Sequence, residues 1–244
     1  MASSKAAVFI GTAGWSVPRA VSGKFPAEGS HLERYAQVYN AVEINSSFYR
    51  PHRPATYERW AASVPRGFRF AVKMPKTITH DLRLQAATRP LVKFLGEVQA
   101  LGAKLGPVLI QLPPSLVFDE KIAGQFFTLL RRHHAGAAAC EPRHASWFEA
   151  AVAPLLVEHR IARVAADPAC VPAAAQPGGW SGLAYRRLHG SPRMYWSSYP
   201  KKFLRGLAAQ IQTSRVAQSW CVFDNTASGA AAENALALKK LAGI

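Results

Sequence analysis

Residues 68–112 contain FRFAVKM (residues 68–74), LVKFLGEVQAL (residues 91–101) and PVLIQL (residues 107–112), and the order of these three segments indicates the fold. The first and third segments are short apolar runs that end at prolines, as strands often do. The middle segment places its apolar residues at helical spacing. A strand, a helix and a second strand in this order predict a parallel βαβ unit.

The same alternation continues in both directions along the chain. Further strands are expected at residues 8–11, 41–45, 137–141, 161–166, 183–188 and 220–223. Further helices are expected at residues 32–39, 56–62, 119–131, 147–159, 203–211 and 229–241. A loop rich in proline and glycine, residues 172–180, stands where another helix would be expected.

Eight such units in about 250 residues predict an α/β protein with a single TIM-like (β/α)8 barrel of parallel strands. The predicted domain is one barrel over residues 1–244. A doubly wound open sheet is the alternative, but the segment GTAG at residues 11–14 is not the glycine-rich fingerprint of a dinucleotide-binding fold.

Composition limits the function classes. The chain has 244 residues, of which 49% are hydrophobic, enough for a proper core. It carries 30 Lys and Arg against 14 Asp and Glu, a formal net charge of +16. The basic residues are scattered, so they predict either a solvated basic surface or a face that binds polyanions.

Targeting signals are not expected from the sequence. No apolar run approaches the roughly 18 residues of a membrane span, and the apolar stretch within residues 1–11 is too short for a signal peptide. Three cysteines without paired spacing indicate reduced thiols and a cytoplasmic location.

Acidic residues are scarce, yet four of the 14 fall at predicted strand ends: Glu43, Glu141, Asp167 and Asp224. Reactive groups of β/α barrels lie at the C-terminal ends of the strands. Grouping so many charges is costly, which predicts either an ion-pair network that fills the polar top of the core or a site with perturbed pKa values.

From these positions we predict two groups of site residues. The predicted catalytic residues are Glu43, Glu141, Asp167 and His189. The predicted substrate-binding residues are Trp15, Asn45, Tyr49, Lys73, His80, Gln111, Arg143, His144, Trp147, Arg187 and Asn225.

Three chemistries are compatible with these residues. A divalent metal could be held by carboxylate and imidazole ligands among Glu43, Glu141, Asp167, His144 and His189, although no local metal motif such as HExxH occurs. Glu43 and Glu141 could instead be a metal-free acid–base pair. Finally, Lys73, Arg143 and Arg187 could bind a phosphate, with help from the loops after the last two strands. The cofactor is therefore left open.

Seven motifs in order resemble the YecE-like family, known as domain of unknown function 72: IGTAGWS (10–16), VEINSSFYR (42–50), FRFAVK (68–73), ITH (78–80), LGPVLIQLPP (105–114), EPRHASW (141–147) and RLHG (187–190). The resemblance covers residues 8–241. It implies a β/α barrel similar to those of metal-dependent sugar isomerases and abasic-site endonucleases.

The sequence departs from this family at a few positions. Ala13 and Val17 stand where the family usually has Ser and Tyr. The last strand reads VFDNT (residues 222–226) instead of the family's usual YFNND, which leaves the role of Asp224 open.

The sequence therefore predicts a hydrolase or lyase, with metal-dependent phosphodiester hydrolysis as one form. Its substrate would be a phosphorylated small molecule or nucleic acid, bound at the C-terminal ends of the strands. The alternative is a non-catalytic barrel that binds nucleic acid or a small ligand.

Overall fold

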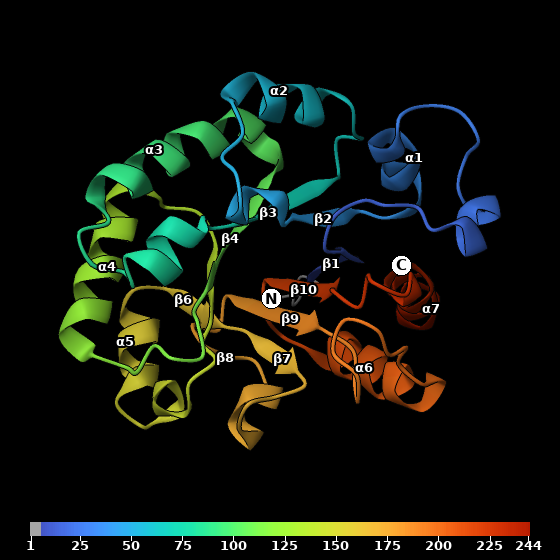
Figure 1. The fold of residues 1–244 in the computed structure, drawn as a ribbon. Coiled ribbons are helices and arrows are strands. Elements are labelled where there is room, and N and C mark those ends of the chain that lie inside the picture. Colours follow the sequence, from blue (N-terminus) through green and yellow to red (C-terminus); the bar gives the residue numbers. More distant parts are fainter. Residues whose placement is uncertain (1–5) are drawn as a thin grey trace, which may run out of the picture.

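The computed structural model describes residues 6–244, so the part of the predicted domain and of the N-terminal apolar stretch at residues 1–5 lies outside the described residues. Strands and helices alternate along the chain (Figure 1). The strands are β1 (Ala7–Thr12), β2 (Ala41–Ile44), β3 (Arg69–Lys73), β4 (Leu105–Gln111), β5 (Ala138–Glu141), β6 (Ile161–Arg163), β7 (Ala165–Asp167), β8 (Gly178–Gly179), β9 (Leu183–Leu188) and β10 (Gln218–Phe223). The α-helices are α1 (His31–Val38), α2 (Pro54–Ala62), α3 (Thr88–Val98), α4 (Glu120–His133), α5 (Val152–Glu158), α6 (Lys201–Thr213) and α7 (Ala230–Ala242).

The strands form two sheets. One has the order β1-β10-β9-β7, and the other has the order β2-β3-β4-β5-β6-β8. Every pairing is parallel except that of the two-residue strand β8 with β6. The predicted α/β class with parallel strands is therefore confirmed, while the hydrogen-bonded ladder is not continuous around one barrel.

The two sheets meet at two places. At one, the predicted strand 161–166 is divided, because β6 belongs to one sheet, β7 belongs to the other, and Val164 lies between them. At the other, β1 and β2 share a single bridge, Ala13 to Glu43, supported by a hydrogen bond from Gly14 N to Glu43 O of 2.9 Å.

Side chains replace the ladder between β1 and β2. The Asn40 amide accepts from Ile10 N at 3.0 Å and donates to Val8 O at 2.7 Å. The Tyr35 hydroxyl accepts from Thr12 N at 2.8 Å and donates to Ala41 O at 3.0 Å. These bonds satisfy the backbone of β1, so the two strands approach without pairing.

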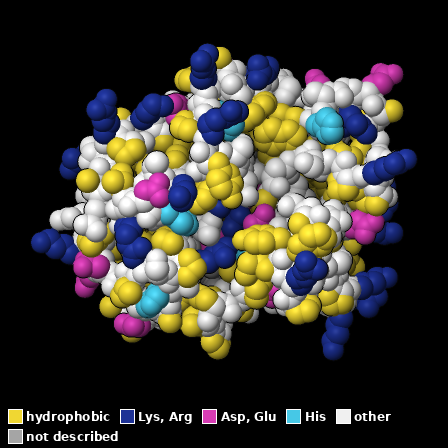
Figure 2. Space-filling view, in the orientation of Figure 1, with side chains coloured by type: hydrophobic (Ala, Val, Ile, Leu, Met, Phe, Trp, Pro, Cys, Tyr) yellow, Lys and Arg dark blue, Asp and Glu magenta, His cyan; other side chains and the backbone are white. Residues whose placement is uncertain are grey.

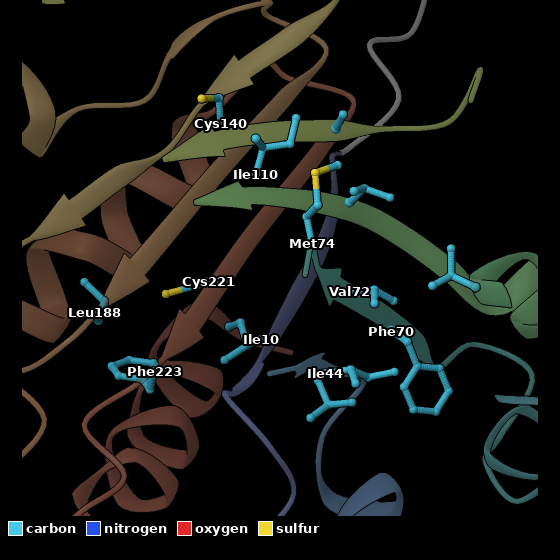
Figure 3. Close-up of a cluster of buried hydrophobic side chains, with 14 of the residues drawn as sticks. Ile10, Ile44, Phe70, Val72, Met74, Ile110, Cys140, Leu188, Cys221 and Phe223 are labelled. Atoms are coloured by element: carbon cyan, nitrogen blue, oxygen red, sulfur yellow. The ribbon is translucent and has the colours of Figure 1, made fainter. Parts of the chain in front are cut away.

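Alternation along the strands divides the core in two. The larger apolar cluster, part of which appears in Figure 3, includes Ile10, Val72 and Ile110 and packs against the helices. A smaller cluster takes the alternate residues of the same strands, such as Ala71 and Leu109. Polar strand-end residues continue the face of this smaller cluster, because residues two apart on a strand share a face.

The helices follow their sequence signals. Helix α1 begins with a capping box in which Ser30 and Glu33 exchange hydrogen bonds, and Asp119 caps α4 through Ile122 N at 2.8 Å. Between β7 and β9 the chain has a 3-10 turn (Pro172–Ala175) and β8 instead of an α-helix, as its proline and glycine content indicated. None of the helices within residues 6–244 has the length and hydropathy to cross a bilayer.

Candidate functional site

Arg187 is the centre of a buried polar network that joins the two sheets. Its guanidinium binds Glu43 at two points, Nε to Oε2 at 3.1 Å and Nη2 to Oε1 at 2.7 Å. It also donates from Nη1 to Glu141 Oε2 at 2.7 Å and from Nη2 to Asp224 Oδ2 at 3.1 Å. One guanidinium therefore holds three carboxylates from three different strands.

His189 closes the network on a second side. Its Nδ1 lies 3.0 Å from Asp224 Oδ2, and its Nε2 lies 2.9 Å from Glu141 Oε1. Arg143 donates from Nη2 to the same Glu141 oxygen at 2.8 Å. Arg143 Nη2 also lies 3.2 Å from His189 Nε2, so this ring nitrogen lies between a carboxylate and a guanidinium.

Strand periodicity explains why these side chains meet. Tyr185, Arg187 and His189 are spaced by two and share the inner face of β9 and its extension. Glu141 is the last residue of β5, and Asp224 directly follows β10. The Tyr185 hydroxyl donates to Glu43 Oε2 at 2.8 Å, so this face carries a continuous polar column.

The charges of the network support one another. Burial raises the pKa of Glu141, but Arg187, His189 and Arg143 outweigh it and hold that pKa well below its usual range. Burial likewise opposes the charge of Arg187, yet its carboxylate partners raise its pKa. The pKa of Asp224 is also lowered, because Arg187 and His189 outweigh burial. Glu141 and Asp224 therefore stay ionised at neutral pH.

Lys73 differs from the other cations of this cluster. It is the last residue of β3 and is 6% exposed. Its Nζ lies 3.9 Å from the centroid of the Phe48 ring. Ser47 Oγ donates to the Lys73 carbonyl at 2.7 Å, but the side-chain amine makes no hydrogen bond or ion pair with any residue in the range 6–244. Burial, followed by the repulsion of Arg187, lowers the pKa of Lys73 to about 8. A buried amine with this pKa is partly unprotonated near neutral pH.

His80 lies beside Lys73 in a π-helical turn, Thr77–Asp81. Its ring packs edge-on against Phe48 at 5.0 Å, and its Nδ1 lies 2.8 Å from Thr79 Oγ1. Burial and the nearby Lys73 ammonium lower the pKa of His80, so its imidazole is neutral at pH 7. Single π-helical turns are frequent at functional sites.

A hollow opens over this region. Figure 2 shows Lys and Arg, Asp and Glu, and His side chains gathered around a depression near the middle of the face, over the space between the two sheets of Figure 1. Three buried polar atoms near these strand ends, Asn45 Oδ1, Arg143 Nε and Asn225 Oδ1, have no partner among the described residues. Such atoms are where a polar ligand would bind.

The donor set does not fit a metal ion. Within residues 6–244, no three His, Cys, Asp or Glu side chains are arranged to hold one. Glu43, Glu141 and Asp224 all bind the guanidinium of Arg187, which occupies the space between them. Asp167 and His144, the remaining carboxylate and imidazole of the predicted ligand set, lie outside this network. The carboxylates of the network are therefore not free to bind a metal ion.

The structure brings some of the predicted residues together and separates others. The network contains Glu43, Glu141, His189, Arg143 and Arg187, with Lys73 and His80 beside it. Asp167 is not part of it. Alternation turns its carboxylate to the outer face of β7, where it accepts a hydrogen bond of 2.8 Å from the Tyr199 hydroxyl.

Several predicted substrate-binding residues have structural partners instead. Trp147 is buried and donates from Nε1 to Leu116 O at 2.9 Å. His144 caps the turn that follows it through Ser146 N. Asn225 donates to Ser197 O and to Asn234 Oδ1, both at 2.9 Å.

The other predicted binding residues lie around the network. Trp15 packs edge-on against Trp60 at 4.9 Å. Tyr49 is 78% exposed and packs edge-on against Phe48. Gln111 is paired in register with Glu141 at the ends of β4 and β5.

Sequence reasoning missed Tyr185, which could have been found because it lies two residues before Arg187 on the same strand face. Asp224, whose role the sequence left open, is a full member of the network.

Known proteins are similar to this chain in sequence and in fold. The family model described as "Protein of unknown function DUF72" matches residues 9–244. The UPF0759 protein YecE of Escherichia coli strain K12 is 32% identical over 106 residues, which are 43% of this chain and 38% of YecE. The UPF0759 protein YunF of Bacillus subtilis strain 168 is 26% identical over 155 residues, 58% of this chain and 52% of YunF. The matches thus span about half of these relatives or less.

Solved structures agree with the sequence matches. A DUF72 family protein from Thermotoga maritima MSB8 superposes with a TM-score of 0.80 at 25% identity, covering 98% of this chain and 100% of that one. One from Enterococcus faecalis V583 gives 0.80 at 19% identity, covering 97% and 96%. A fusion protein of a xylose isomerase-like TIM barrel and a 4-hydroxyphenylpyruvate dioxygenase shares the fold at a TM-score of 0.53 and 15% identity, covering 96% of this chain and 41% of that one. With a family model matched over nearly its whole length, the chain belongs to the DUF72 family.

Proposed function

We propose that this chain is a lyase that acts on a phosphorylated carbonyl compound through the amine of Lys73. The observation that carries the proposal is that Lys73 is only 6% exposed and its Nζ has no hydrogen-bond acceptor among residues 6–244, at the edge of a network whose carboxylates are all bound by Arg187. A lysine desolvated beside another cation is the usual form of an amine nucleophile.

The surrounding groups divide the work. Arg187 is fully engaged with protein carboxylates, so it positions the network instead of binding substrate as the sequence suggested. Arg143, whose side chain is 17% exposed and whose Nε is unpartnered within the described chain, is the cation that would bind the phosphate. His80 is the neutral imidazole that would move protons beside Lys73.

The proposed reaction begins with addition of the unprotonated Lys73 amine to the carbonyl carbon. A C–N bond forms, and a proton passes from nitrogen to the former carbonyl oxygen with His80 as the carrier. Protonation of this hydroxyl and loss of water then leave a protonated imine. In a β-hydroxy carbonyl substrate, the imine accepts the electron pair of the bond between the α and β carbons as that bond breaks, and the β fragment leaves as a second carbonyl compound after its hydroxyl proton passes to His80. The enamine that remains is protonated at its α carbon and becomes an imine again. Water adds to this imine, and its hydrolysis releases the product and restores the Lys73 amine.

The protein would perform this reaction as a single (β/α)8-type barrel in the cytoplasm. The fold likeness to a TIM-barrel protein and the two junctions between the sheets support the barrel. The cytoplasmic location is supported by three cysteines that remain free thiols, Cys140, Cys170 and Cys221.

A second candidate function is binding of single-stranded nucleic acid without turnover. It is favoured by exposed aromatic side chains near the network: Tyr49 at 78%, Tyr195 at 42% and Trp196 at 46% exposure. Tyr195 lies edge-on to His189 at 5.9 Å, and Arg193 lies over the Trp196 ring at 4.5 Å. Aromatic faces and a net charge of +16 suit stacked bases and phosphates.

The test is imine trapping. The protein is mixed with a panel of phosphorylated aldehydes and ketones and reduced with borohydride, and the adduct is located by peptide mass spectrometry. The proposal expects a stable adduct on Lys73 with at least one compound, and its loss in Lys73→Arg, which keeps the charge. Lys24→Arg, on the surface, is the matched control. No adduct with any member of the panel, or adducts spread over surface lysines, would overturn the proposal.

The nucleic-acid function has its own readout. Oligonucleotide binding should weaken steeply with salt and should survive Lys73→Arg. Binding of that kind without any trapped imine would favour the second function over the first.

A further inference from the structure

A cavity lies beside β7 and β9, where the chain between these strands forms no α-helix. It has a volume of about 500 Å³ and is lined by residues of α6, of β7 and β9, and of the segment that follows β7. Its walls are mainly apolar, with contributions from Ala165, Leu188, Phe203 and Leu207. This volume lies within the range of small-molecule sites.

A buried arginine lines this cavity without a counter-ion. Arg186 is only 7% exposed, and no carboxylate of residues 6–244 lies within ion-pair distance of it. Its one side-chain hydrogen bond is a long one, 3.4 Å from Nη1 to Ser219 Oγ. Burial lowers the pKa of Arg186, because no carboxylate of the described residues lies close enough to offset the desolvation of its charge.

Arg186 and its neighbour Arg187 make a direct contrast. The two residues are adjacent on β9 and face opposite sides of the sheet. Arg187 binds three carboxylates supplied by the chain, whereas Arg186 lines the cavity and binds none. A largely buried guanidinium whose one side-chain partner is a long hydrogen bond to Ser219 is suited to an anion that comes from outside.

The other residues that line the cavity indicate which kind of anion would bind beside Arg186. Asp167 lies at the C-terminal end of the cavity, two register positions beyond Arg186 along the paired strands β7 and β9, and it would repel a second negative charge. Lys202 is exposed at the rim. The cavity thus offers one buried positive charge, apolar walls and an acidic end, which suits a monoanion with an apolar body.

A glycine keeps the space open. Gly206 lies in the middle of α6 and lines the cavity, and a Cβ placed there would meet no atom within 4 Å. Glycine is unfavourable inside a helix, so a larger residue at this position would strengthen α6 and fill the cavity at the same time.

We infer that this cavity is a second binding site, for a small carboxylate with an apolar body, in which the guanidinium of Arg186 binds the carboxylate and the walls of β7, β9 and α6 hold the apolar part. The site lies on the outer face of the sheet, opposite the Lys73 amine, and the inference does not rest on the proposed lyase activity.

The test uses the purified full chain and octanoate, with binding measured by calorimetry. Octanol and octyl phosphate, which share the apolar body, are the comparison ligands, and butyrate and dodecanoate vary its length. The expected result is saturable binding of octanoate, at least tenfold weaker binding of octanol, and weaker binding of the dianionic octyl phosphate.

Two variants address the two parts of the site. Arg186→Met keeps the bulk and removes the charge, and it should weaken octanoate binding at least tenfold while leaving octanol binding unchanged. Gly206→Leu should abolish binding of both ligands. Gly96→Leu, at an exposed glycine inside α3 with equally open space around its Cβ position, is the matched control and should bind octanoate as the parent does.

The binding measurements can contradict the inference in several ways. Absence of saturable binding for every carboxylate, equal affinity for octanol and octanoate, or unchanged octanoate affinity in Arg186→Met or Gly206→Leu would each overturn the inference. Far-ultraviolet circular dichroism and a melting curve on each variant ensure that lost binding reflects the site and not the fold. Octanoate binding should also persist in Lys73→Arg, so failure of the lyase proposal and failure of this one are distinguishable.

Discussion

Arg187 and Glu43 lie 144 positions apart in the sequence and form a two-point ion pair across the two sheets, with distances of 2.7 and 3.1 Å. Both side chains are at most 1% exposed. The pair therefore joins β9 of one sheet to β2 of the other through charges that have left water. Removing one partner of such a pair is costly because the other stays buried and charged.

We expect Glu43→Gln to destabilise the protein by about 3–5 kcal/mol, since the amide turns a donor toward the Arg187 guanidinium and leaves it without a carboxylate. Urea unfolding followed by circular dichroism measures this change. The exposed Glu58→Gln is the control and should stay within about 0.5 kcal/mol of the parent. A loss in Glu43→Gln as small as that of the control would contradict the view that this pair joins the sheets.

The depressed carboxylate pKa values predict acid sensitivity. The folded pKa of Glu141 lies well below 4.5 and that of Asp224 lies below 3.8, which are the ordinary values. Their stabilising contribution is present above the ordinary values and is lost as pH falls toward the folded ones. The urea midpoint should therefore drop steadily below about pH 4.5.

The same titration on a variant identifies the residue responsible. Glu141→Gln should be less stable at pH 7 and should show a shallower fall of the urea midpoint on acidification. Parallel curves for the parent and the variant would show that other carboxylates dominate acid unfolding.

Burial of the Lys73 ammonium should lower the free energy of unfolding, although the proposed lyase needs this amine. Its pKa falls from 10.5 to about 8 on folding, so the unfolded chain holds the proton more tightly and stability should rise between about pH 8 and pH 10.5. Lys73→Met keeps the volume without the charge, and it should be more stable than the parent at pH 7 by roughly 1–3 kcal/mol.

Urea unfolding at pH 7 and at pH 10 checks this prediction, since the advantage of Lys73→Met should shrink at the higher pH. The exposed Lys24→Met should show no such pH dependence. A less stable Lys73→Met would mean that the ammonium gains more from Phe48 and the nearby carboxylates than it loses by burial.

Tyr199 holds the segment that follows β9. Its hydroxyl accepts from Gly190 N at 2.8 Å and donates to Asp167 Oδ1 at 2.8 Å. Tyr199→Phe leaves a buried N–H unsatisfied, and we expect it to cost about 1–3 kcal/mol. Hydrogen exchange should become faster at Gly190 and through residues 191–198, while β10 stays protected. Unchanged exchange at Gly190 would show that water replaces the hydroxyl without loss.

Most of the fold could be predicted because its signals are local. Apolar runs and helical spacing located the eight main strands and the seven helices, since each pattern depends on neighbouring residues alone. The discontinuity between β1 and β2 could not be predicted. It depends on Asn40 and Tyr35 bonding to the backbone of another strand, which is a contact set by the tertiary structure.

The candidate site was predictable for a related reason. Scarce acids at strand ends identified Glu43 and Glu141, because the ends of parallel strands converge. The same rule failed at Asp167, where one position along the strand decides which face the carboxylate takes. The strand-end rule also could not show that the Arg187 guanidinium would be bound by carboxylates of the protein itself, because that depends on how three strand ends are arranged in space.

Glu43 makes two contacts between the sheets. Its backbone forms the single bridge from β2 to β1, and its carboxylate binds Arg187 of β9. Assembly of the molecule and assembly of its polar centre are therefore one event. A chain whose halves have not yet come together has no arranged charges, and Lys73 in such a chain is an ordinary solvated amine. The proposed reactivity of Lys73 would therefore arise only in molecules that have finished folding.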